Sequence, residues 1–216
     1  MQKPNVIAID GTFASGKGTL AKKLAAHYNL AYLDTGKLYR AVAKAVLDEG
    51  ADPNNEVSAT TAAQELGKSD LMAQLADPEL KSGPVGAAAS KVAVHKKVRA
   101  ALFDLQRGFA AKGAVLDGRD IGTVICPDAD VKIYVDAKPE IRAQRRHAEL
   151  VGYGETLTYE DVLAQLTERD SRDMGRKDAP LKPALDSHFL DSSKLGIEDA
   201  FAMACKIIDA VMASKN

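Results

Sequence analysis

The chain of 216 residues contains no tryptophan, only two cysteines, and aromatic side chains at 5% of its positions. No apolar run approaches the roughly 20 residues that are needed to span a bilayer. The first ten residues, MQKPNVIAID, lack the apolar stretch and the small-residue cleavage site of a signal peptide. Cys126 and Cys205 lie far apart in the sequence. These absences argue against a membrane-spanning or disulfide-stapled protein, and favour a cytoplasmic protein with two reduced, buried thiols.

The chain also lacks an excess of charge of either sign. Its 29 basic and 30 acidic side chains give a net charge of -1, which argues against a general affinity for nucleic acid or for an anionic membrane surface. The four histidines are scattered, and none has the spacing of a metal ligand. We therefore expect no nucleic-acid or membrane partner, and the near-neutral charge favours a monomer.

Short apolar runs alternate with longer stretches of helical periodicity. The runs are continuously apolar, which is typical of strands buried in a parallel sheet. They are NVIAID, LAYLD, GAVLD, VKIYVD and HFLDSS, and helices are predicted at about residues 16–28, 36–49, 86–111, 139–151, 158–173 and 197–213. This alternation predicts an α/β fold in which helices flank a parallel five-stranded sheet, with ligands bound beyond the carboxyl ends of the strands.

Residues 51–85 differ from the rest of the chain. This segment is polar, is interrupted by Pro53, Pro78 and Pro84, and contains no convincing core strand. It is either a small helical insert that covers a ligand or a solvated connector.

The stretch IDGTFASGKGT follows the first predicted strand and opens the first predicted helix. Gly11 and the run GKGT at residues 16–19 fit the phosphate-loop pattern G-x-x-x-x-G-K-[ST], with one extra glycine before Thr19. Glycines let backbone N–H groups converge on phosphate oxygens, and the helix offers its positive end to the same anion. Lys17 can reach the β- and γ-phosphates, and the Thr19 hydroxyl can approach Mg²⁺ directly or through water. The pattern predicts a P-loop site for a nucleoside triphosphate.

Arginines near the same edge of the sheet indicate a second anionic ligand. Arg40 lies in the helix after the second strand, and Arg119 and Asp120 lie in a loop directly after the third, between Gly118 and Gly122. The planar fork of an arginine side chain suits a phosphate. A charged pair in such a loop is more often functional than not.

Two arginine-rich stripes lie between residues 139 and 180. EIRAQRRHAEL predicts one helical stripe, and TERDSRDMGRKDAP predicts a second, with its arginines three, four or seven residues apart. Either stripe alone would be a solvated helix face paired with nearby acids. Joined by VGYGETLTY in a chain with a phosphate loop, the two indicate a lid that brings cations to transferring phosphates and excludes water.

With these motifs assembled, the sequence resembles the bacterial cytidylate kinases, in the nucleoside monophosphate kinase group. The resemblance spans nearly the whole chain and rests on IDG…SGKGTL, LDTG…YR, AAASKVA…VR, LDGRDIGTVICPDADVKIYVDA, RAQRR, ERDSRD…R…APL and LDSS…I. DGRDIGTV followed by ERDxRD is much more specific than the phosphate loop. The resemblance implies direct in-line transfer of a phosphoryl group from ATP, with Mg²⁺, to CMP and dCMP.

The same resemblance assigns residues to roles. Those implied to bind ATP are Gly11, Thr12, Phe13, Ala14, Ser15, Gly16, Lys17, Gly18 and Thr19, of which Thr19 also faces Mg²⁺. Those implied to bind CMP are Asp34, Arg40, Ser90, Arg99, Arg119, Asp120, Asp173 and Arg176. Lys17, Arg119 and the lid residue Arg169 are the expected catalytic residues. Ser90, Arg99 and Asp120 match groups that read cytosine, whose acceptor carbonyl and ring nitrogen lie beside a donor amine.

The helix predicted over residues 86–111 must be broken if Ser90 and Arg99 are to face one base. Nine residues are about two and a half turns, so a straight helix would point the two side chains in opposite directions. The apolar face also shifts between Val92 and Val98. We therefore predict a break near residues 95–97.

The resemblance also implies a division of the chain, with a kinase core at residues 1–50 and 86–216, a lid at about 145–176, and residues 51–85 as a short insert for the nucleoside monophosphate. Family members often carry a small antiparallel sheet in the insert, for which this segment is too short. Two alternatives remain: a kinase for UMP or AMP, or a nucleotide-dependent binding switch. A switch needs a residue that positions the attacking water, and no clear motif supplies one.

Overall fold

The computed structural model describes residues 4–68 and 70–215. At its centre is a five-stranded sheet in the order β2-β3-β1-β4-β5. The strands are β1 (Val6–Gly11), β2 (Ala31–Asp34), β3 (Ala114–Gly118), β4 (Val131–Asp136) and β5 (His188–Asp191). β1 pairs in parallel with β3 and with β4, and β4 pairs in parallel with β5. The five predicted strands and their parallel arrangement are therefore confirmed.

The chain forms two compact units. The first consists of residues up to Leu33 together with those from Phe109 onward, and the second is Asp34–Gly108. The predicted insert, residues 51–85, lies entirely within the second unit. The division into core, insert and lid stays a prediction.

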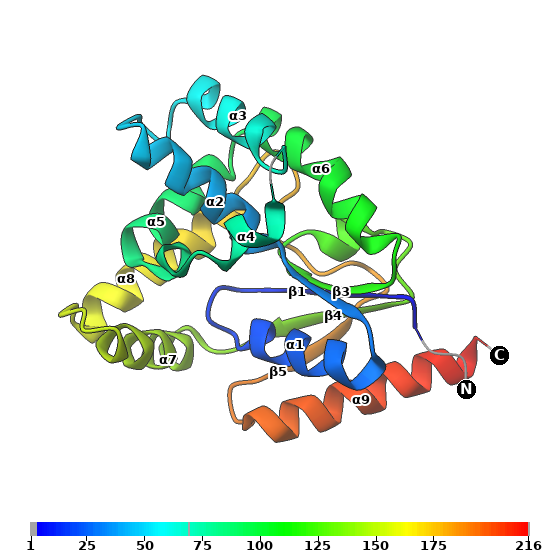
Figure 1. Cartoon of the computed structure of the whole chain (residues 1–216). Coiled ribbons are helices and arrows are strands. Elements are labelled where there is room, and N and C mark those ends of the chain that lie inside the picture. The colour runs from blue at the N-terminus through cyan, green and yellow to red at the C-terminus, as the bar shows by residue number, and fades with distance from the viewer. Residues whose placement is uncertain (1–3, 69, 216) are drawn as a thin grey trace. The chain divides into compact units, whose positions relative to one another are not determined.

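In the first unit, α1 (Lys17–Tyr28) and α9 (Ile197–Ser214) lie together on one face of the sheet (Figure 1). The buried residues of α9, Ala200, Ala204, Ile208 and Met212, recur every fourth position and form one apolar stripe. This stripe joins the sheet residues Ile7, Ile9, Val115, Ile133 and Leu190 in a single core. Burial of these side chains fixes the strands whose carboxyl ends carry the polar residues.

Also in the first unit, α7 (Pro139–Gly152) and α8 (Tyr159–Met174) form a helical hairpin (Figure 1). Pro139 suits the first turn of α7 because that turn leaves its N–H groups without helical partners. The Thr158 side chain caps α8 by accepting a hydrogen bond from the Asp161 backbone N–H, and the Asp161 carboxylate accepts one from the Thr158 backbone N–H. The hairpin has its own small core of Ala143, Leu150, Val162 and Leu166.

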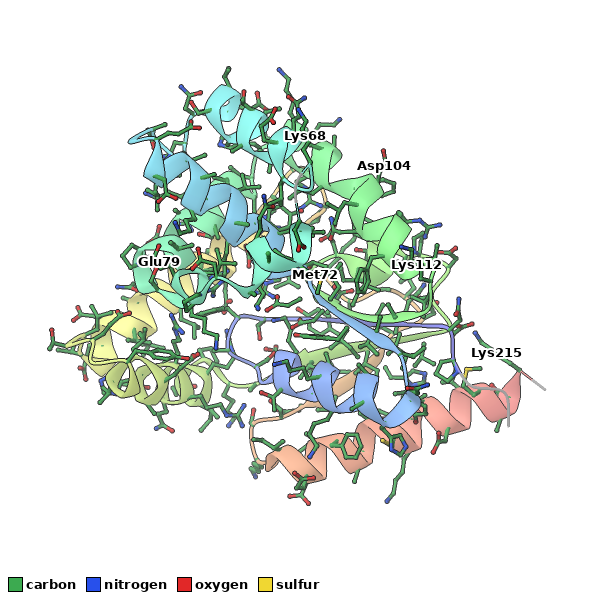
Figure 2. The ribbon with its side chains drawn as sticks, in the orientation of Figure 1. Lys68, Met72, Glu79, Asp104, Lys112 and Lys215 are labelled. Carbon is green, nitrogen blue, oxygen red and sulfur yellow. The ribbon has the colours of Figure 1, made fainter. Side chains whose placement is uncertain are left out.

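The second unit is helical: α2 (Thr35–Asp48), α3 (Glu56–Glu65), α4 (Leu71–Ala76), a 3₁₀ turn (Pro78–Lys81), α5 (Gly83–Val92) and α6 (Lys96–Ala110). The described residues of 51–85 contain no strand. The predicted break is confirmed, since α5 ends at Val92 and α6 begins at Lys96. α6 is amphipathic, with Leu102 and Gln106 buried, and Asp104 points away from the helix into solvent (Figure 2).

Two expectations about burial were wrong in part. β5 is at the edge of the sheet, and Phe189 on it is 62% exposed because only one side of the strand is paired; its ring stacks on Tyr134 with centroids 6.1 Å apart. Cys126 is buried as predicted, but Cys205 is only half-buried. Both cysteines are free thiols.

A buried carboxyl group ties β1 to the turn after β3. Asp10 accepts two backbone hydrogen bonds, from Ile121 N to its Oδ1 and from Gly122 N to its Oδ2, each 2.7 Å long. A Cβ on Gly122 would lie 3.3 Å from Oδ2, so glycine leaves room for this close approach. Burial raises the pKa of Asp10 from 3.8 to about 7, and the two N–H donors oppose that shift. The position of the turn that carries Arg119 and Asp120 depends on this contact.

We expect Asp10→Asn to be less stable than the wild type by an amount that depends on pH. The amide has one acceptor oxygen, so one backbone N–H loses its partner. Between pH 3.8 and 7 folded Asp10 holds a proton that the unfolded chain has released, so its contribution to stability is greatest below 3.8 and is lost as the pH rises through 7. The difference in the free energy of unfolding between the wild type and Asp10→Asn should therefore narrow by about 2 kcal/mol between about pH 5 and pH 7.

Urea unfolding of both proteins across this range measures the gap. Asp104→Asn, on the exposed face of α6, is the control and should stay within about 0.5 kcal/mol of the wild type at each pH. A gap between Asp10→Asn and the wild type that is constant over the range would contradict the prediction.

Candidate functional site

The loop between β1 and α1 depends on its glycines for its path. A Cβ on Gly11 would lie 1.9 Å from the carbonyl oxygen of Val135 on β4, a distance that no side chain permits. Gly16 has a φ of 86°, in the left-handed region, and forms the N-cap of α1. The loop therefore leaves β1 against the backbone of β4 and enters α1 with its N–H groups at the helix terminus. This is a cradle that suits a phosphate.

Lys17 and Asp117 form an ion pair beside this cradle. Lys17 is the first residue of α1, and its Nζ lies 3.3 Å from Oδ1 of Asp117, at the end of β3. A Cβ on Gly18 would lie 3.1 Å from the other oxygen of Asp117. Asp117 is not among the site residues predicted from the sequence. The signal was present, because a strand ending in aspartate next to the phosphate-loop strand delivers a carboxylate to the same edge.

The loop is held to neighbouring elements by its hydroxyl groups. The Thr12 hydroxyl donates to Asp136 Oδ1 at 2.5 Å, at the end of β4. The Ser15 hydroxyl donates to the Thr12 carbonyl at 3.0 Å, and Ser192 donates to the Ser15 carbonyl at 2.7 Å. The hydroxyl groups of Thr12 and Ser15 thus stabilise the loop itself. The loop therefore offers an anion its backbone N–H groups.

Phe13 and Ala14 at the tip of the loop pack against the core of the α7–α8 hairpin. The guanidinium carbon of Arg169, on α8, lies 4.1 Å from the centroid of the Phe13 ring. That of Arg146, on α7, lies 5.6 Å from it. In addition, Arg142 donates to the Phe13 carbonyl at 3.1 Å. The structure thus joins the phosphate loop to both arginine-rich stripes.

Asp173 brings Arg119 and Arg176 together. Arg119 Nε donates to Asp173 Oδ2 at 2.9 Å, and Arg176 donates to Oδ1 of the same carboxylate. Burial favours the neutral acid, but the charges of Arg119, Arg176 and Arg169 prevail and hold the pKa of Asp173 below its usual range. Burial likewise opposes the charge of Arg119, and Asp173 raises the pKa of this arginine above its usual value. The shared carboxylate therefore keeps Arg119 charged and holds both arginines in position.

Arg142 and Asp170 make a second buried ion pair, which links α7 to α8. Arg142 Nη1 lies 2.7 Å from Asp170 Oδ2, and Arg142 Nε donates to the Ala137 carbonyl at 2.7 Å. Burial raises the pKa of Asp170, although the charge of Arg142 opposes the rise. Arg142 on α7 thus has a carboxylate partner on α8, and Arg146 on α7 pairs with Glu149 of its own helix.

A cavity of about 470 Å³ lies beside this pair, a volume in the range of small-molecule sites. Its lining includes Asp136, Asp170 and Asp191 as well as Arg142 and Lys138. Three carboxylates in one cavity disfavour a polyanion. The triphosphate is therefore better matched to the glycine cradle than to this cavity.

In the second unit, Arg40 of α2 lies against α5. Its Nη1 donates to the Leu80 carbonyl at 2.5 Å, and a Cβ on Gly86 would lie 3.7 Å from its Nη2. Ser90 is one turn beyond Gly86 on the same face of α5. Arg40 therefore lies against the face of α5 that carries Ser90.

Arg99, near the start of α6, also lies beside α2. It is buried, and its Nη1 donates to the Tyr39 hydroxyl at 3.4 Å. Arg99 therefore lies against the helix that carries Arg40, and its grouping with Arg40 and Ser90 rests on the sequence resemblance. Asp34 lies at the N-terminus of α2, as its N-cap residue.

The predicted site residues therefore form two groups, one in each unit. The first unit brings together the phosphate loop, Lys17, Arg119, Arg169, Asp173 and Arg176, with buried Asp120 in the turn after β3. The second unit holds Asp34, Arg40, Ser90 and Arg99. Asp34 is included in this second group on the sequence resemblance alone.

The donor atoms beside the cradle suit Mg²⁺. This ion prefers oxygen ligands and retains several waters in protein sites. The Asp117 carboxylate and the Thr19 hydroxyl, in the first turn of α1, both supply oxygen at the edge of the cradle. The residues present therefore fit a magnesium ion that is bound together with a triphosphate.

Comparison with known proteins places the chain in a family. The model of the cytidylate kinase family matches residues 7–210. The cytidylate kinase of Rhodopseudomonas palustris is 55% identical over 98% of this chain and 99% of its own length. That of Brucella suis biovar 1 is 52% identical over 97% of this chain and 95% of its own length.

Among solved structures, an uncharacterized protein from Eubacterium ventriosum matches 95% of this chain and 98% of its own, with a TM-score of 0.51 and 16% identity. That likeness supports the fold alone. In the described ranges, 4–68 and 70–215, no helix has both the length and the apolarity to cross a membrane. The match to the family model and the two close relatives, with the phosphate loop and its arginines in place, show that the chain belongs to the cytidylate kinase family.

Proposed function

We propose that the chain phosphorylates CMP, and dCMP, by direct in-line transfer of the γ-phosphoryl group of ATP, using the two groups of residues described above. Membership of the cytidylate kinase family supports the reaction and its two nucleotide substrates. The observation that carries the assignment of residues is the glycine cradle with Lys17 at its edge. Positioning and charge stabilisation are the main demands of phosphoryl transfer, because little covalent chemistry is left to the protein.

ATP binds with its phosphates in the cradle formed by residues 11–19. Backbone N–H groups and the N-terminus of α1 bind the anion, and the side chain of Lys17 moves from Asp117 to the β- and γ-phosphates. Asp117 and Thr19 would hold Mg²⁺, and when bound the ion neutralises charge on the phosphate oxygens. The cradle and its oxygen donors support this arrangement.

The phosphate of the acceptor binds to Arg40 and Arg119, and Arg169 faces the transferring group. The buried carboxylate of Asp173 supports this role for Arg119, because it keeps the guanidinium charged and oriented before a substrate arrives. Asp173 and Arg176 lie near the ribose by resemblance. Arg119 therefore has little to reorganise when the acceptor phosphate binds.

The cytosine ring is read by Ser90, Arg99 and Asp120. The positions of Ser90 and Arg99 on either side of the helix break support their joint role. Family membership and the near-neutral charge of the chain support a cytoplasmic monomer without a nucleic-acid or membrane partner.

We expect Lys17→Ala to lower kcat by at least about 100-fold, because it removes the cation from the charge that develops in transfer. A coupled ADP-release assay measures turnover, and circular dichroism checks that the variant is folded. Lys23→Ala is the matched control: Lys23 is on the same helix, but it pairs with exposed Glu198 at 2.6 Å, and turnover should stay within about twofold. Near-normal turnover in Lys17→Ala would contradict the mechanism.

The acceptor is tested by the same assay with AMP, GMP, UMP, CMP and dCMP. We expect the highest kcat/KM for CMP and dCMP, and Ser90→Ala should lower kcat/KM for CMP about tenfold because the base loses a buried hydrogen-bond partner. Ser58→Ala, on α3 of the same unit, should leave it unchanged. A preference for UMP or AMP would identify the alternative kinase. ATP hydrolysis that is indifferent to every monophosphate would instead favour the binding switch.

A further inference from the structure

Lys132 of β4 is a buried charged residue to which the mechanism above assigns no role. Its exposed fraction is 7%, and a lysine is seldom buried to this extent unless its ammonium has partners. Its neighbours on the strand, Val131 and Ile133, belong to the core beneath α1 and α9. Because side chains alternate across a strand, Lys132 lies on the opposite face of the sheet. Asp10 lies on that face too, since Ile9 beside it belongs to the same core.

The ammonium of Lys132 joins two segments that are far apart in the sequence. Its Nζ donates to the Pro127 carbonyl at 2.6 Å and to both carboxylate oxygens of Asp186, at 2.9 and 2.7 Å. Pro127 follows the π-helical turn Ile121–Ile125 after β3, and Asp186 precedes β5. The lysine holds the pKa of Asp186 below its usual range by this hydrogen bonding. One cation thus ties the end of the turn after β3 to the segment before β5.

The stem of Lys132 also supports this turn. A Cβ on Gly122 would lie 3.1 Å from Cδ of Lys132, and the N–H of the same glycine donates to Asp10 at 2.7 Å. Asp10 therefore binds N–H groups at the start of the turn, and Lys132 binds a carbonyl oxygen after its end. This order of charges complements the polarity of a helical turn, which begins with N–H groups and ends with carbonyl groups that lack helical partners. π-helical turns are rare and frequently occur at functional sites.

A second route leads from Lys132 to Arg119. The Leu181 N–H donates to the Asp173 carbonyl at 2.9 Å, and the Asp173 carboxylate accepts from Arg119. The segment between α8 and β5 is thus attached to the partner of Arg119 at Leu181, and to Lys132 at Asp186. Contacts that begin at Lys132 therefore reach Arg119 both through the turn and through this segment.

We propose that Lys132 is a positioning residue for the acceptor phosphate: it holds the turn after β3 and thereby keeps Arg119 in place for CMP. This inference rests on the proposed function and deepens it. Asp173 orients the guanidinium of Arg119, whereas Lys132 acts on the backbone that follows this residue. A binding side chain is held within the tolerance of its site only when the structure that supports it is also fixed.

The test is the substitution Lys132→Met, which keeps the apolar stem beneath Gly122 and removes the ammonium. We expect the KM for CMP to rise by about three- to tenfold, because a small displacement of Arg119 weakens its contact with the acceptor phosphate. The KM for ATP should stay within about twofold, since Gly11 and Thr12 fix the phosphate loop against β4 independently of Lys132.

A double-mutant cycle separates positioning from a general loss of structure. In an Arg119→Met background, Lys132→Met should change the KM for CMP by less than about 1.5-fold, because the side chain that it positions has been removed. Equal factors in the two backgrounds, or equal rises in the KM for CMP and for ATP, would indicate a purely structural role and overturn the proposal.

Asp186→Asn is the matched control for the ion pair. Asparagine still accepts a hydrogen bond from the ammonium, and Lys132 keeps its contact with Pro127, so the KM for CMP should stay within about twofold. Thermal unfolding shows which variants are folded. Lys132→Gln provides a second test if methionine prevents folding: its side chain is polar but one bond too short to reach Pro127, and the KM for CMP should rise as well. An unchanged KM for CMP in a folded variant at position 132 would overturn the proposal.

Failure of the proposed function has a different signature. A wild-type chain that does not phosphorylate CMP would reject that function and, with it, the role of Lys132. An active wild type whose KM for CMP is unaffected by Lys132→Met would reject only the role of Lys132.

Discussion

The close approach of β1 to β4 is the constraint on which the site depends. At Gly11 the two backbones are so near that a single added carbon would meet a carbonyl oxygen at 1.9 Å. The adjacent residues secure β1 on both sides: Asp10 binds the turn after β3, and Thr12 binds Asp136 at the end of β4. Three consecutive residues thus fix the start of the phosphate loop relative to β4 and to the turn after β3, which carries Arg119. A cradle placed this rigidly needs little adjustment when an anion binds.

The cations of the first unit are stabilised in two different ways. Lys17, Arg119, Arg142 and Arg176 each form an ion pair with a carboxylate. The guanidinium of Arg169 lies over the Phe13 ring, 4.1 Å from its centroid, and its charge also helps to lower the pKa of Asp173. Since a buried charge without a partner is costly, both arrangements allow a concentration of positive charge to persist in a folded chain of nearly neutral composition.

Elements whose signal is local could be predicted from the sequence. Periodicity located the strands and most helices to within one or two residues, and the shift of the apolar face in residues 86–111 located the break between α5 and α6. Contacts between distant side chains could not be predicted this way. Nothing near Phe13 indicates that its ring meets an arginine more than 150 residues later, and Asp173 is 54 residues from Arg119. Asp117 was missed although its position at the end of a strand was a sufficient signal.

The glycines of the phosphate loop differ in whether a second substitution elsewhere in the chain could compensate for their replacement during evolution. The obstacle to a side chain at Gly11 is a backbone oxygen of Val135, and every amino acid presents that oxygen. No second-site substitution of a side chain can therefore act as a suppressor of a replacement at position 11. At Gly18 the obstacle is the Asp117 carboxylate, 3.1 Å away, and a shorter or rotated side chain there can make room. Position 11 is closed to compensation by any second side chain, whereas at position 18 the obstacle is a side chain, which can rotate.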